Sequence, residues 1–403
     1  MSAVVTRPAG RRRGIARGTA LGWAAVALAL VAFLMTVPPF LVRTVIPSAV
    51  LAIGAVALGT AAVRSGHKRL GWGAVAGAAL AFLGAYGATR ASVDKLEAVV
   101  TWGALTAAML RFATPLIFAA LGGLISERAG VVNIGLEGML LMGAFWAAWG
   151  ADKTGSWALG ILVGVIAGMA LALVHAVFSV SLRSDQIVSG TAINFLALGI
   201  TGFFYVDTYG AEGTPDNLPQ VPEIKLPTED LGFIGAAISN LNLLVWGALL
   251  ACLVVWLFVF RTARGLRLRS VGENPRAAET VGVDVYRVRY LAVVASGALA
   301  ALGGAFLSIG FVHSFTQNMT AGRGFIALAA LIFGAWKPLG LLLATLLFGF
   351  SSALAQRLPE FSEQAATLFQ ALPYVLTLIA VAGLVGRSIP PAADGVPYKR
   401  GGG

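Results

Sequence analysis

Two polar residues, Asn133 and Glu137, interrupt an apolar stretch of helix length, SERAGVVNIGLEGMLLMGAF (126–145). Amides and carboxylates are costly inside a bilayer, so they normally face a water-filled path or a protein interior. The four-residue spacing places both side chains on one face of a helix. We therefore expect Asn133 and Glu137 to line a path for a polar solute. Two alternatives stay open: Asn133 joins helices by hydrogen bonds, and Glu137 pairs with an internal cation, Arg128 or Arg111.

A second pair, Thr191 and Asn194, lies three residues apart in another apolar stretch and also shares one helical face. Phe195 follows directly, and further aromatic residues occupy positions 203–205. A hydroxyl and a neutral amide can replace water around a passing solute, and aromatic rings can stack on a planar one. The alternative for Thr191 and Asn194 is again a hydrogen bond between helices.

Chemistry that makes or breaks covalent bonds has no candidate residues here. No G-x-x-x-x-G-K-[ST] motif is present, so the chain is not expected to hold ATP phosphates itself. The three histidines, His67, His175 and His313, are isolated and predict no metal site. The single cysteine, Cys252, permits no internal disulfide. We expect a protein that binds no cofactor and is not an enzyme.

The elements that must position these residues are membrane helices. Hydrophobic residues make up 58% of the 403 residues and charged residues only 12%, about half the charged share of soluble domains. Repeated apolar stretches of about 18 residues or more predict an all-α, polytopic helix bundle. The twelve expected spans are 19–37, 45–63, 70–89, 103–124, 131–149, 157–181, 187–205, 242–260, 290–311, 322–336, 338–356 and 368–386.

The formal net charge of +11 is explained by the distribution of basic residues in a membrane protein rather than by nucleic-acid binding. If the N-terminus is cytoplasmic and the spans alternate, the cytoplasmic segments contain 21 Lys and Arg residues and the outer segments contain 7. We therefore expect a multi-pass protein of the cytoplasmic membrane with both termini inside. The arginine-rich first 18 residues and the apolar run after them resemble a signal peptide, but no cleavage-site pattern follows, so a retained first helix is expected.

The amino-acid composition of the expected spans changes near residue 98. Spans before it contain almost no polar residues, whereas polar residues recur within later spans. This predicts accessory helices in 1–98, a functional core in 99–390 and a cytoplasmic tail in 391–403. Two short, glycine-containing spans, 131–149 and 322–336, are typical of an inverted repeat with a pathway at mid-membrane. Helix-packing glycines or re-entrant segments are the alternatives.

The cytoplasmic loop 262–289 is expected to contain a short helix outside the membrane, at 275–281. Asn274 can cap it, Pro275 suits its first position, and Gly282 can end it in a left-handed conformation. Two helical turns are marginal in water, so something must hold them. The alternatives are lipid headgroups, the helix bundle itself and a groove on a partner protein. The apolar face of this helix consists of Ala277, Ala278 and Val281.

Four blocks in the same order resemble the permease subunits of bacterial ABC importers, specifically the nucleoside and simple-sugar permeases related to the ribose and branched-chain amino acid systems. The blocks are SERAGVVNIGLEGM, DQIVSGTAINFLALG (185–199), VGENPRAAETVGVDVYRVRY (271–290) and GRGFIALAALIFGAWKPLG (322–340). The resemblance covers about 290 residues, from 99 to 389. It implies a ten-helix core preceded by the accessory helices.

This resemblance implies that the loop contacts an ATPase subunit through a coupling helix. The implied coupling residues are Gly272, Glu273, Asn274, Pro275, Arg276, Ala277, Ala278 and Gly282. ATP would be hydrolysed by that partner. A second permease, either different or a copy of this chain, and an extracytoplasmic solute-binding lipoprotein would complete the importer.

The same resemblance makes a nucleoside the expected solute, with a simple sugar as the alternative. The implied substrate pathway consists of Asn133, Glu137, Thr191, Asn194 and Phe195. Two rivals come from other classes of protein. One is an ion-coupled secondary transporter that uses Glu137 as the ion carrier, and the other is a membrane scaffold without transport activity.

Overall fold

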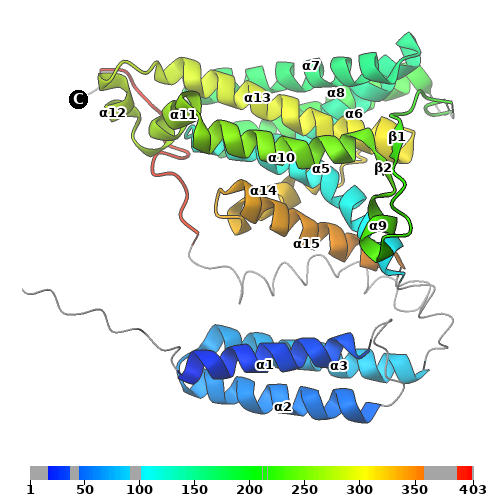
Figure 1. Ribbon diagram of the computed structural model, residues 1–403. Helices are drawn as coiled ribbons and strands as arrows, with labels where there is room; N and C mark the ends of the chain where they lie inside the picture. The colour runs from blue at the N-terminus through cyan, green and yellow to red at the C-terminus, as the bar shows by residue number, and fades with distance from the viewer. Residues whose placement is uncertain are drawn as a thin grey trace, which may run out of the picture. The chain divides into compact units, whose positions relative to one another are not determined.

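The computed structural model describes residues 17–36, 45–90, 101–210, 212–215, 217–357 and 388–401, which form helices and one small sheet (Figure 1). The expected span 368–386 lies outside these ranges. The chain forms two compact units, one with helices α1–α3 and one with the helices from α5 onward and the C-terminal segment. The prediction of an all-α, polytopic helix bundle is confirmed.

The first unit is a bundle of three helices, α1 (Arg17–Leu34), α2 (Val45–Arg64) and α3 (Lys68–Arg90). Its core consists of the alanines Ala29, Ala32, Ala52, Ala55, Ala78 and Ala81. Small side chains let helix backbones approach closely, which is a main source of helix association in lipid. Packing of small residues thus holds these three helices together.

The second unit contains the remaining helices and the two strands. Its helices are α5 (Trp102–Arg128), α6 (Leu136–Thr154), α7 (Trp157–Ala176), α8 (Gln186–Tyr209), α9 (Gly232–Ile238), α10 (Leu243–Arg261), α11 (Ala263–Glu273), α12 (Pro275–Thr280), α13 (Val285–Ala305), α14 (Arg323–Phe333) and α15 (Pro338–Arg357). Helices α7 and α13 continue into wider π-helical turns, Val177–Ser181 and Phe306–Val312. Strands β1 (Glu223–Lys225) and β2 (Asn240–Asn242) pair antiparallel.

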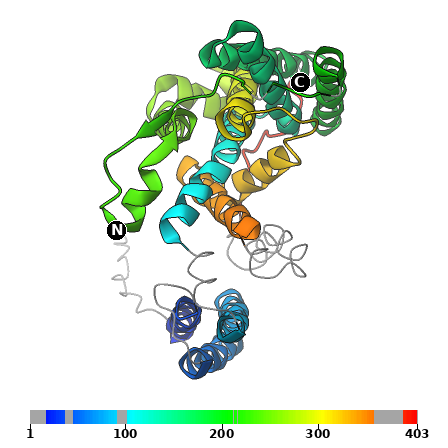
Figure 2. The ribbon, with the colours of Figure 1, turned by 90° about the vertical axis from the view of Figure 1, so that its right-hand side faces the viewer.

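Helix α13 is central to this unit and packs against α5, α6 and α7. Figure 2 looks along these helices and shows α13 surrounded by them. Aromatic side chains fill the space between α6, α13 and the chain after it: Phe145, Phe306 and Phe315 are fully buried. The rings of Phe145 and Phe315 meet edge to face at 5.1 Å, a favourable aromatic geometry. The core therefore fixes α6 against α13.

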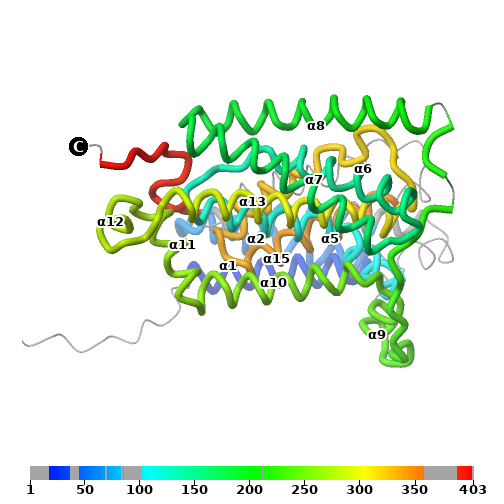
Figure 3. Tube along the Cα trace, turned by 90° about the horizontal axis from the view of Figure 1, so that it is seen from above, coloured from blue at the N-terminus to red at the C-terminus, as the bar shows by residue number. Residues whose placement is uncertain are grey.

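The two ends of the second unit differ in what they contain. Helices α11 and α12 and the C-terminal segment lie at one end, whereas β1, β2 and α9 lie at the other (Figures 1 and 3). These are called the α12 end and the sheet end below. The sheet register places Ile224 opposite Leu241.

Seven of the described helices are long and apolar enough to cross a membrane, so the chain is a multi-pass membrane protein. Among the expected spans that the structure describes, two are interrupted. The segment 322–336 yields α14, a helix of 11 residues that extends only about 16 Å, too short to cross a bilayer of about 30 Å. The segment 131–149 becomes helical only at Leu136.

Candidate functional site

The chain between α5 and α6 is unwound, including residues 131–135, which the sequence predicts as the start of the span 131–149. Helix α5 ends at Arg128, Gly130 adopts a left-handed φ of +83°, and α6 begins at Leu136. Asn133 therefore precedes the helix. The prediction that Asn133 and Glu137 share one helical face is wrong, because the backbone between them is not helical.

Side chains from α7 and α8 supply hydrogen bonds to this unwound segment. Gln186 Oε1 accepts from the Val132 amide at 2.7 Å, and the Val132 carbonyl lies 3.1 Å from His175 Nε2. Because a carbonyl only accepts, Nε2 carries the imidazole proton, and His175 Nδ1 accepts from the Ser189 hydroxyl at 3.0 Å. The polar residues of α7 and α8 thus replace the missing helical bonds.

Asn194 binds the same segment further along. Its Nδ2 donates to the Ile134 carbonyl at 3.0 Å, and its Oδ1 accepts from the Gly138 amide at 2.8 Å. Gly138 lies in the first turn of α6, whose amides have no partner within the helix. Irregular backbone at membrane depth persists only where protein covers and satisfies it. Asn194 therefore fixes the beginning of α6 to α8.

Asn133 is fully buried at the interface between the unwound segment and α13. Its Nδ2 donates to the Ser296 hydroxyl at 2.9 Å. Its Oδ1 has no hydrogen-bond partner within the described part of the chain. Asn133 therefore joins the unwound segment to α13 through its amide nitrogen.

Glu137 is also buried, with 8% of its surface exposed, and it faces the beginning of α14. Its Oε1 accepts from the Thr320 hydroxyl at 2.6 Å and the Gly322 amide at 2.8 Å. Its Oε2 accepts from the Gly324 amide at 2.5 Å. A carboxylate at a helix N-terminus satisfies free amides and complements the positive end of the helix dipole. The alternative that Glu137 pairs with Arg128 or Arg111 is wrong, since its partners are at the N-terminus of α14.

The contact between Glu137 and α14 requires glycine at position 324. A Cβ atom there would lie 2.5 Å from both the backbone nitrogen and the Cα of Glu137. Real Cβ atoms do not approach backbone that closely. The first turns of α6 and α14 are therefore in direct backbone contact.

Arg111 and Arg128, the cations considered as partners of Glu137, bind elsewhere. Arg111 Nη2 donates to the Asn240 carbonyl at 3.0 Å. Arg128 Nη2 donates to the Trp336 carbonyl at 2.8 Å, just after α14, and Trp336 Nε1 donates to Glu127 at 2.6 Å. Since Arg128 ends α5, helix α14 runs from the level of Glu137 toward the α12 end.

Helices α6 and α14 are thus two interrupted helices whose N-termini meet at one carboxylate. Asn133, just before α6, bonds to Ser296, which lies 11 residues into α13, about 16 Å along that helix. The meeting point therefore lies inside the unit rather than at either end. Paired interrupted helices of this kind are how many transporters build a site at mid-membrane.

The remaining sequence-predicted pathway residues lie on two faces of α8. Asn194 points toward α6, as described above. Thr191 and Phe195 are exposed, Phe195 with 70% of its surface. The Thr191 hydroxyl donates to the Ile187 carbonyl of its own helix at 2.8 Å. The place where the N-termini of α6 and α14 meet at Glu137 is called the crossing below. The structure therefore brings Asn133, Glu137 and Asn194 to the crossing, whereas Thr191 and Phe195 lie outside it.

Four residues of the crossing were missed by the sequence: His175, Gln186, Ser296 and Thr320. His175 and Ser296 carry the signal that singled out Asn133, a polar side chain inside an apolar helix, whereas Gln186 precedes the expected span 187–205. Thr320 carries no such signal, because it lies in a polar connection. Across the described ranges, no group of three or more His, Cys, Asp or Glu side chains is placed to hold a metal ion.

At the α12 end, the predicted short helix is present. Helix α12 spans Pro275–Thr280, with Asn274 Oδ1 accepting from the Ala277 amide at 3.0 Å and Gly282 at a left-handed φ of +83°. The cap, the first-turn proline and the glycine stop therefore act as expected. The loop also contains α11, which the sequence did not predict.

The apolar residues expected to share one face of α12 differ in burial. Ala278 is buried against Val271, Val285 and Tyr398. Ala277 is exposed, and Val281 just after the helix has 78% of its surface exposed. The prediction of one shared apolar face is wrong, because the helix ends at Thr280 and the chain turns away. An exposed outer face remains available at the α12 end.

These features suit a transporter subunit, and the comparisons with known proteins identify its family. The sequence profile of one family, described as branched-chain amino acid transport system / permease component, matches residues 105–381. The chain belongs to this permease family. The resemblance to ABC importer permeases is thereby confirmed, and the family is one of transporter subunits rather than enzymes.

Several relatives of this permease match over most of their length. It is 42% identical over 307 residues to the guanosine ABC transporter permease protein NupQ of Bacillus subtilis, covering 73% of this chain and 96% of the relative. It is 39% identical over 315 residues to the nucleoside ABC transporter permease protein NupC of Lactococcus lactis, covering 75% and 99%. A putative glucose ABC transporter permease of Haloferax volcanii is 40% identical over 260 residues, covering 63% and 78%. No solved structure matches the permease.

The family match begins at residue 105, close to the start of α5. Both interrupted helices and α12 lie within the matched region. Helices α1–α3 lie before it. The crossing and the α12 end are therefore parts of the family region, and the three-helix unit is additional to it.

Proposed function

We propose that this permease is the membrane-spanning subunit of an ATP-driven importer that carries a nucleoside across the cytoplasmic membrane. The observation that carries this proposal is its 42% identity to a guanosine permease over 96% of that protein. A second nucleoside permease is 39% identical over 99% of its length. Matches of this extent leave little of either relative without a counterpart in this chain.

Three partners follow from this proposal: an ATPase subunit, a second permease and an extracytoplasmic solute-binding lipoprotein. The ATPase binds and hydrolyses ATP, since the permease itself has no phosphate-binding loop. The exposed outer face of α12, including Ala277 and Val281, supports an ATPase contact at the α12 end. Helices presented in this way commonly fit a groove on a partner.

The orientation proposed is the one with the α12 end and both termini in the cytoplasm. Exposed basic residues gather at the α12 end: Arg261, Arg264, Arg267, Arg276 and Arg287. The sheet end holds the acidic residues Glu223, Glu229 and Asp230. Positive charge on cytoplasmic segments is the usual pattern in membrane proteins.

The proposed substrate pathway includes Asn133, Glu137, Thr191, Asn194 and Phe195. In this structure the crossing at Glu137 is closed, because its carboxylate on α6 accepts hydrogen bonds from Thr320, Gly322 and Gly324 at the beginning of α14. Transport by alternating access requires a second packing in which this region opens. The proposed path of the nucleoside runs along α8, where Asn194 faces the crossing and the exposed Thr191 and Phe195 provide a hydroxyl and a ring.

The two alternative functions are a sugar importer and an ion-coupled carrier. A sugar importer is favoured by the 40% identity to a putative glucose permease. An ion-coupled carrier would use Glu137, but that carboxylate is buried and already accepts three hydrogen bonds. The nucleoside importer is preferred because the nucleoside relatives match over almost their whole length.

The deciding experiment is reconstitution of the complex formed by this permease and its co-purified ATPase and second permease in liposomes. Uptake of radiolabelled guanosine is measured with the solute-binding protein and ATP on the appropriate sides. We expect uptake that needs ATP, persists with a proton uncoupler and is competed by unlabelled nucleosides but not by glucose. Uptake that collapses with the uncoupler and proceeds without ATP would establish a secondary carrier instead. Competition by glucose alone would establish a sugar importer.

A further inference from the structure

The C-terminal segment 388–401 contacts elements that are far apart in the sequence, and it is called the tail strap below. It lies along the α12 end of the second unit (Figures 1 and 3). Hydrogen bonds join it to α14, α11, α13 and α12. None of these contacts belongs to the substrate pathway or to the ATPase contact proposed above.

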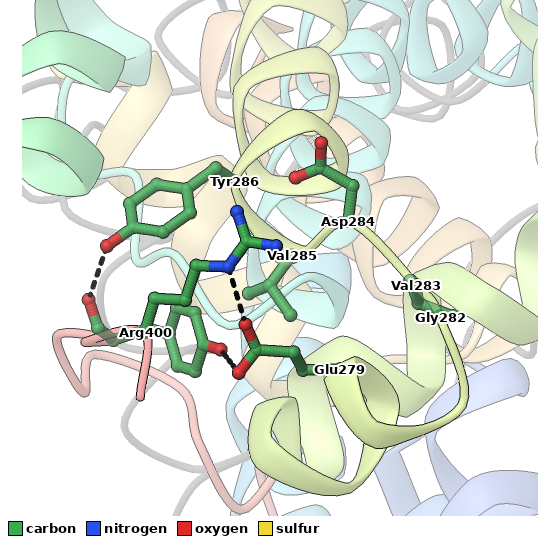
Figure 4. A pocket seen from close by; sticks show the side chains of 8 residues that line it. Glu279, Gly282, Val283, Asp284, Val285, Tyr286 and Arg400 are labelled. Carbon is green, nitrogen blue, oxygen red and sulfur yellow. Dashed lines mark hydrogen bonds and ion pairs between the residues drawn. The ribbon is translucent and has the colours of Figure 1, made fainter. Parts of the chain in front are cut away.

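The tail strap holds α12 from its inner side. The Tyr398 hydroxyl donates to Glu279 Oε2, and Arg400 Nε lies 3.0 Å from Glu279 Oε1 (Figure 4). The ring of Tyr398 is buried, with 6% exposure, and packs with Ala278 of α12. A six-residue helix is not stable alone. Tyr398 therefore supplies much of the surface on which α12 rests.

Midway, the tail strap is bound to α11 and α13. The Ala393 amide donates to the Gly272 carbonyl at 2.8 Å, and the Ala392 amide donates to Glu273 Oε2 at 3.3 Å. Arg289 Nη1 donates to the Val396 carbonyl at 3.0 Å. Arg289 is itself buried, with 1% exposure. The strap thus follows the permease closely between its two ends.

The beginning of the tail strap is bound to α14. The Ser388 hydroxyl donates to the Ile332 carbonyl at 2.7 Å, near the C-terminal end of that helix. The N-terminal end of α14 is held by Glu137 at the crossing. A continuous series of contacts therefore runs from α12, along the strap, to α14 and the crossing.

We propose that the tail strap couples α12 to α14, with Tyr398 as the positioning residue that seats α12 on the strap. Movement of α12 then displaces the strap, and the strap displaces the C-terminal end of α14. This inference rests on the proposed function, because the movement of α12 originates in an ATPase partner. Coupling of this kind needs a connected set of contacts that can adopt two packings.

The test compares three variants of the complete complex in liposomes. Tyr398→Ala removes both the ring and the hydroxyl, Tyr398→Phe keeps the ring, and Lys399→Ala changes an exposed neighbour in the same segment. Nucleoside uptake per ATP hydrolysed is measured together with the amount of ATPase retained. We expect Tyr398→Ala to lower the uptake per ATP about three- to tenfold with the ATPase retained. Tyr398→Phe should lie between Tyr398→Ala and the unchanged protein, and Lys399→Ala should have no effect.

A second readout does not depend on the solute. Cys252 is replaced by serine and Phe325 of α14, half-exposed, by cysteine. The labelling rate of this cysteine is compared with and without ATP plus vanadate, which traps the ATPase. We expect trapping to change the rate in the protein with an intact strap and to leave it unchanged with Tyr398→Ala. This result would hold even if the solute were not a nucleoside, so it separates failure of the inference from failure of the proposed function.

Two outcomes would overturn the inference. One is a Tyr398→Ala complex with the uptake per ATP and the labelling change of the unchanged protein, since the strap would then transmit nothing. The other is loss of the ATPase from both Tyr398 variants, which would make the residue part of the docking surface. If only Tyr398→Ala loses the ATPase, an intermediate effect of Tyr398→Phe on the labelling change supports the inference, and no effect contradicts it.

Discussion

The carboxylate of Glu137 accepts a hydrogen bond of 2.5 Å from the Gly324 amide, 187 residues away in the chain. This bond joins the first turns of α6 and α14, two interrupted helices that meet inside the unit. Negative charge at a helix N-terminus is favourable, more so when partly buried. Glu137 is therefore placed to hold the two helices together in this conformation.

Replacing Glu137 by glutamine should weaken this junction. The amide keeps one oxygen but loses the charge, and its NH₂ group faces backbone donors. We expect a loss of about 1–2 kcal/mol of stability, seen as a lower thermal unfolding midpoint in detergent, together with reduced uptake. Glu212→Gln, in an exposed connection, serves as the control. An unchanged midpoint for Glu137→Gln would contradict the structural role.

Gly324→Ala tests the backbone contact itself. The new Cβ would lie 2.5 Å from backbone atoms of Glu137, so α14 must move. We expect destabilisation of about 1–3 kcal/mol and poor recovery of the folded permease on size-exclusion chromatography. Gly199→Ala in α8, where a Cβ meets nothing within 4 Å, should be neutral or slightly stabilising. Equal behaviour of the two variants would argue against a close contact at position 324.

Asn194→Leu and Thr191→Val separate two roles on one helix. Asn194 satisfies Ile134 and Gly138, so its loss leaves two backbone groups without partners and should cost about 2–4 kcal/mol. Thr191 bonds only within α8, and its change to valine should leave the free energy of unfolding within about 0.5 kcal/mol of the original. If Thr191 lines the pathway, its variant should instead raise the KM for uptake. A Thr191→Val permease with unaltered uptake kinetics would remove Thr191 from the pathway.

The outer face of α12 predicts a contrast between adjacent alanines. Ala277 is exposed, whereas Ala278 is buried. Ala277→Asp should leave the permease folded but weaken ATPase binding at least about tenfold, measured by co-purification and titration. Ala278→Asp should instead reduce the yield of folded permease, since it buries a charge. An ATPase complex unaffected by Ala277→Asp would contradict the contact at α12.

The tail strap should respond to pH through Asp394. Burial raises the pKa of this carboxyl from 3.8 to about 7, against the opposing effects of the Gly395 amide and the Arg289 guanidinium. Glu127 of α5 and Arg289 of α13 are the titratable groups near it. The packed strap therefore keeps the proton up to about pH 7, whereas a detached strap loses it near pH 3.8.

Detachment of the strap thus releases a proton between about pH 4 and 7, so the packed strap loses stability as the pH rises through this range. We expect faster hydrogen exchange in residues 388–401 at pH 8 than at pH 5.5, after correction for the intrinsic rate. Asp394→Asn, which cannot ionise, should abolish the difference. A corrected rate independent of pH in the unchanged protein would exclude this role of Asp394.

The sequence determined the class of the fold and several local features, because these depend on composition and on neighbouring residues. Apolar stretches predicted the membrane helices, and the Asn274 cap, Pro275 and Gly282 predicted α12 to within one residue. Polar residues inside apolar stretches identified Asn133, Glu137 and Asn194, three residues that the structure places at the crossing. The motif blocks identified the family.

The partners of these residues depend on the folded arrangement of the helices. Glu137 and Gly324 are distant in sequence, and nothing in either local pattern indicates that they meet. The break before α6 depends on Gln186, His175 and Asn194, which satisfy its backbone from other helices. The strap from α14 to α12 likewise arises from single contacts between separate segments. Periodicity and composition describe each segment alone, whereas hydrogen bonds and packing between segments depend on how the chain folds back on itself.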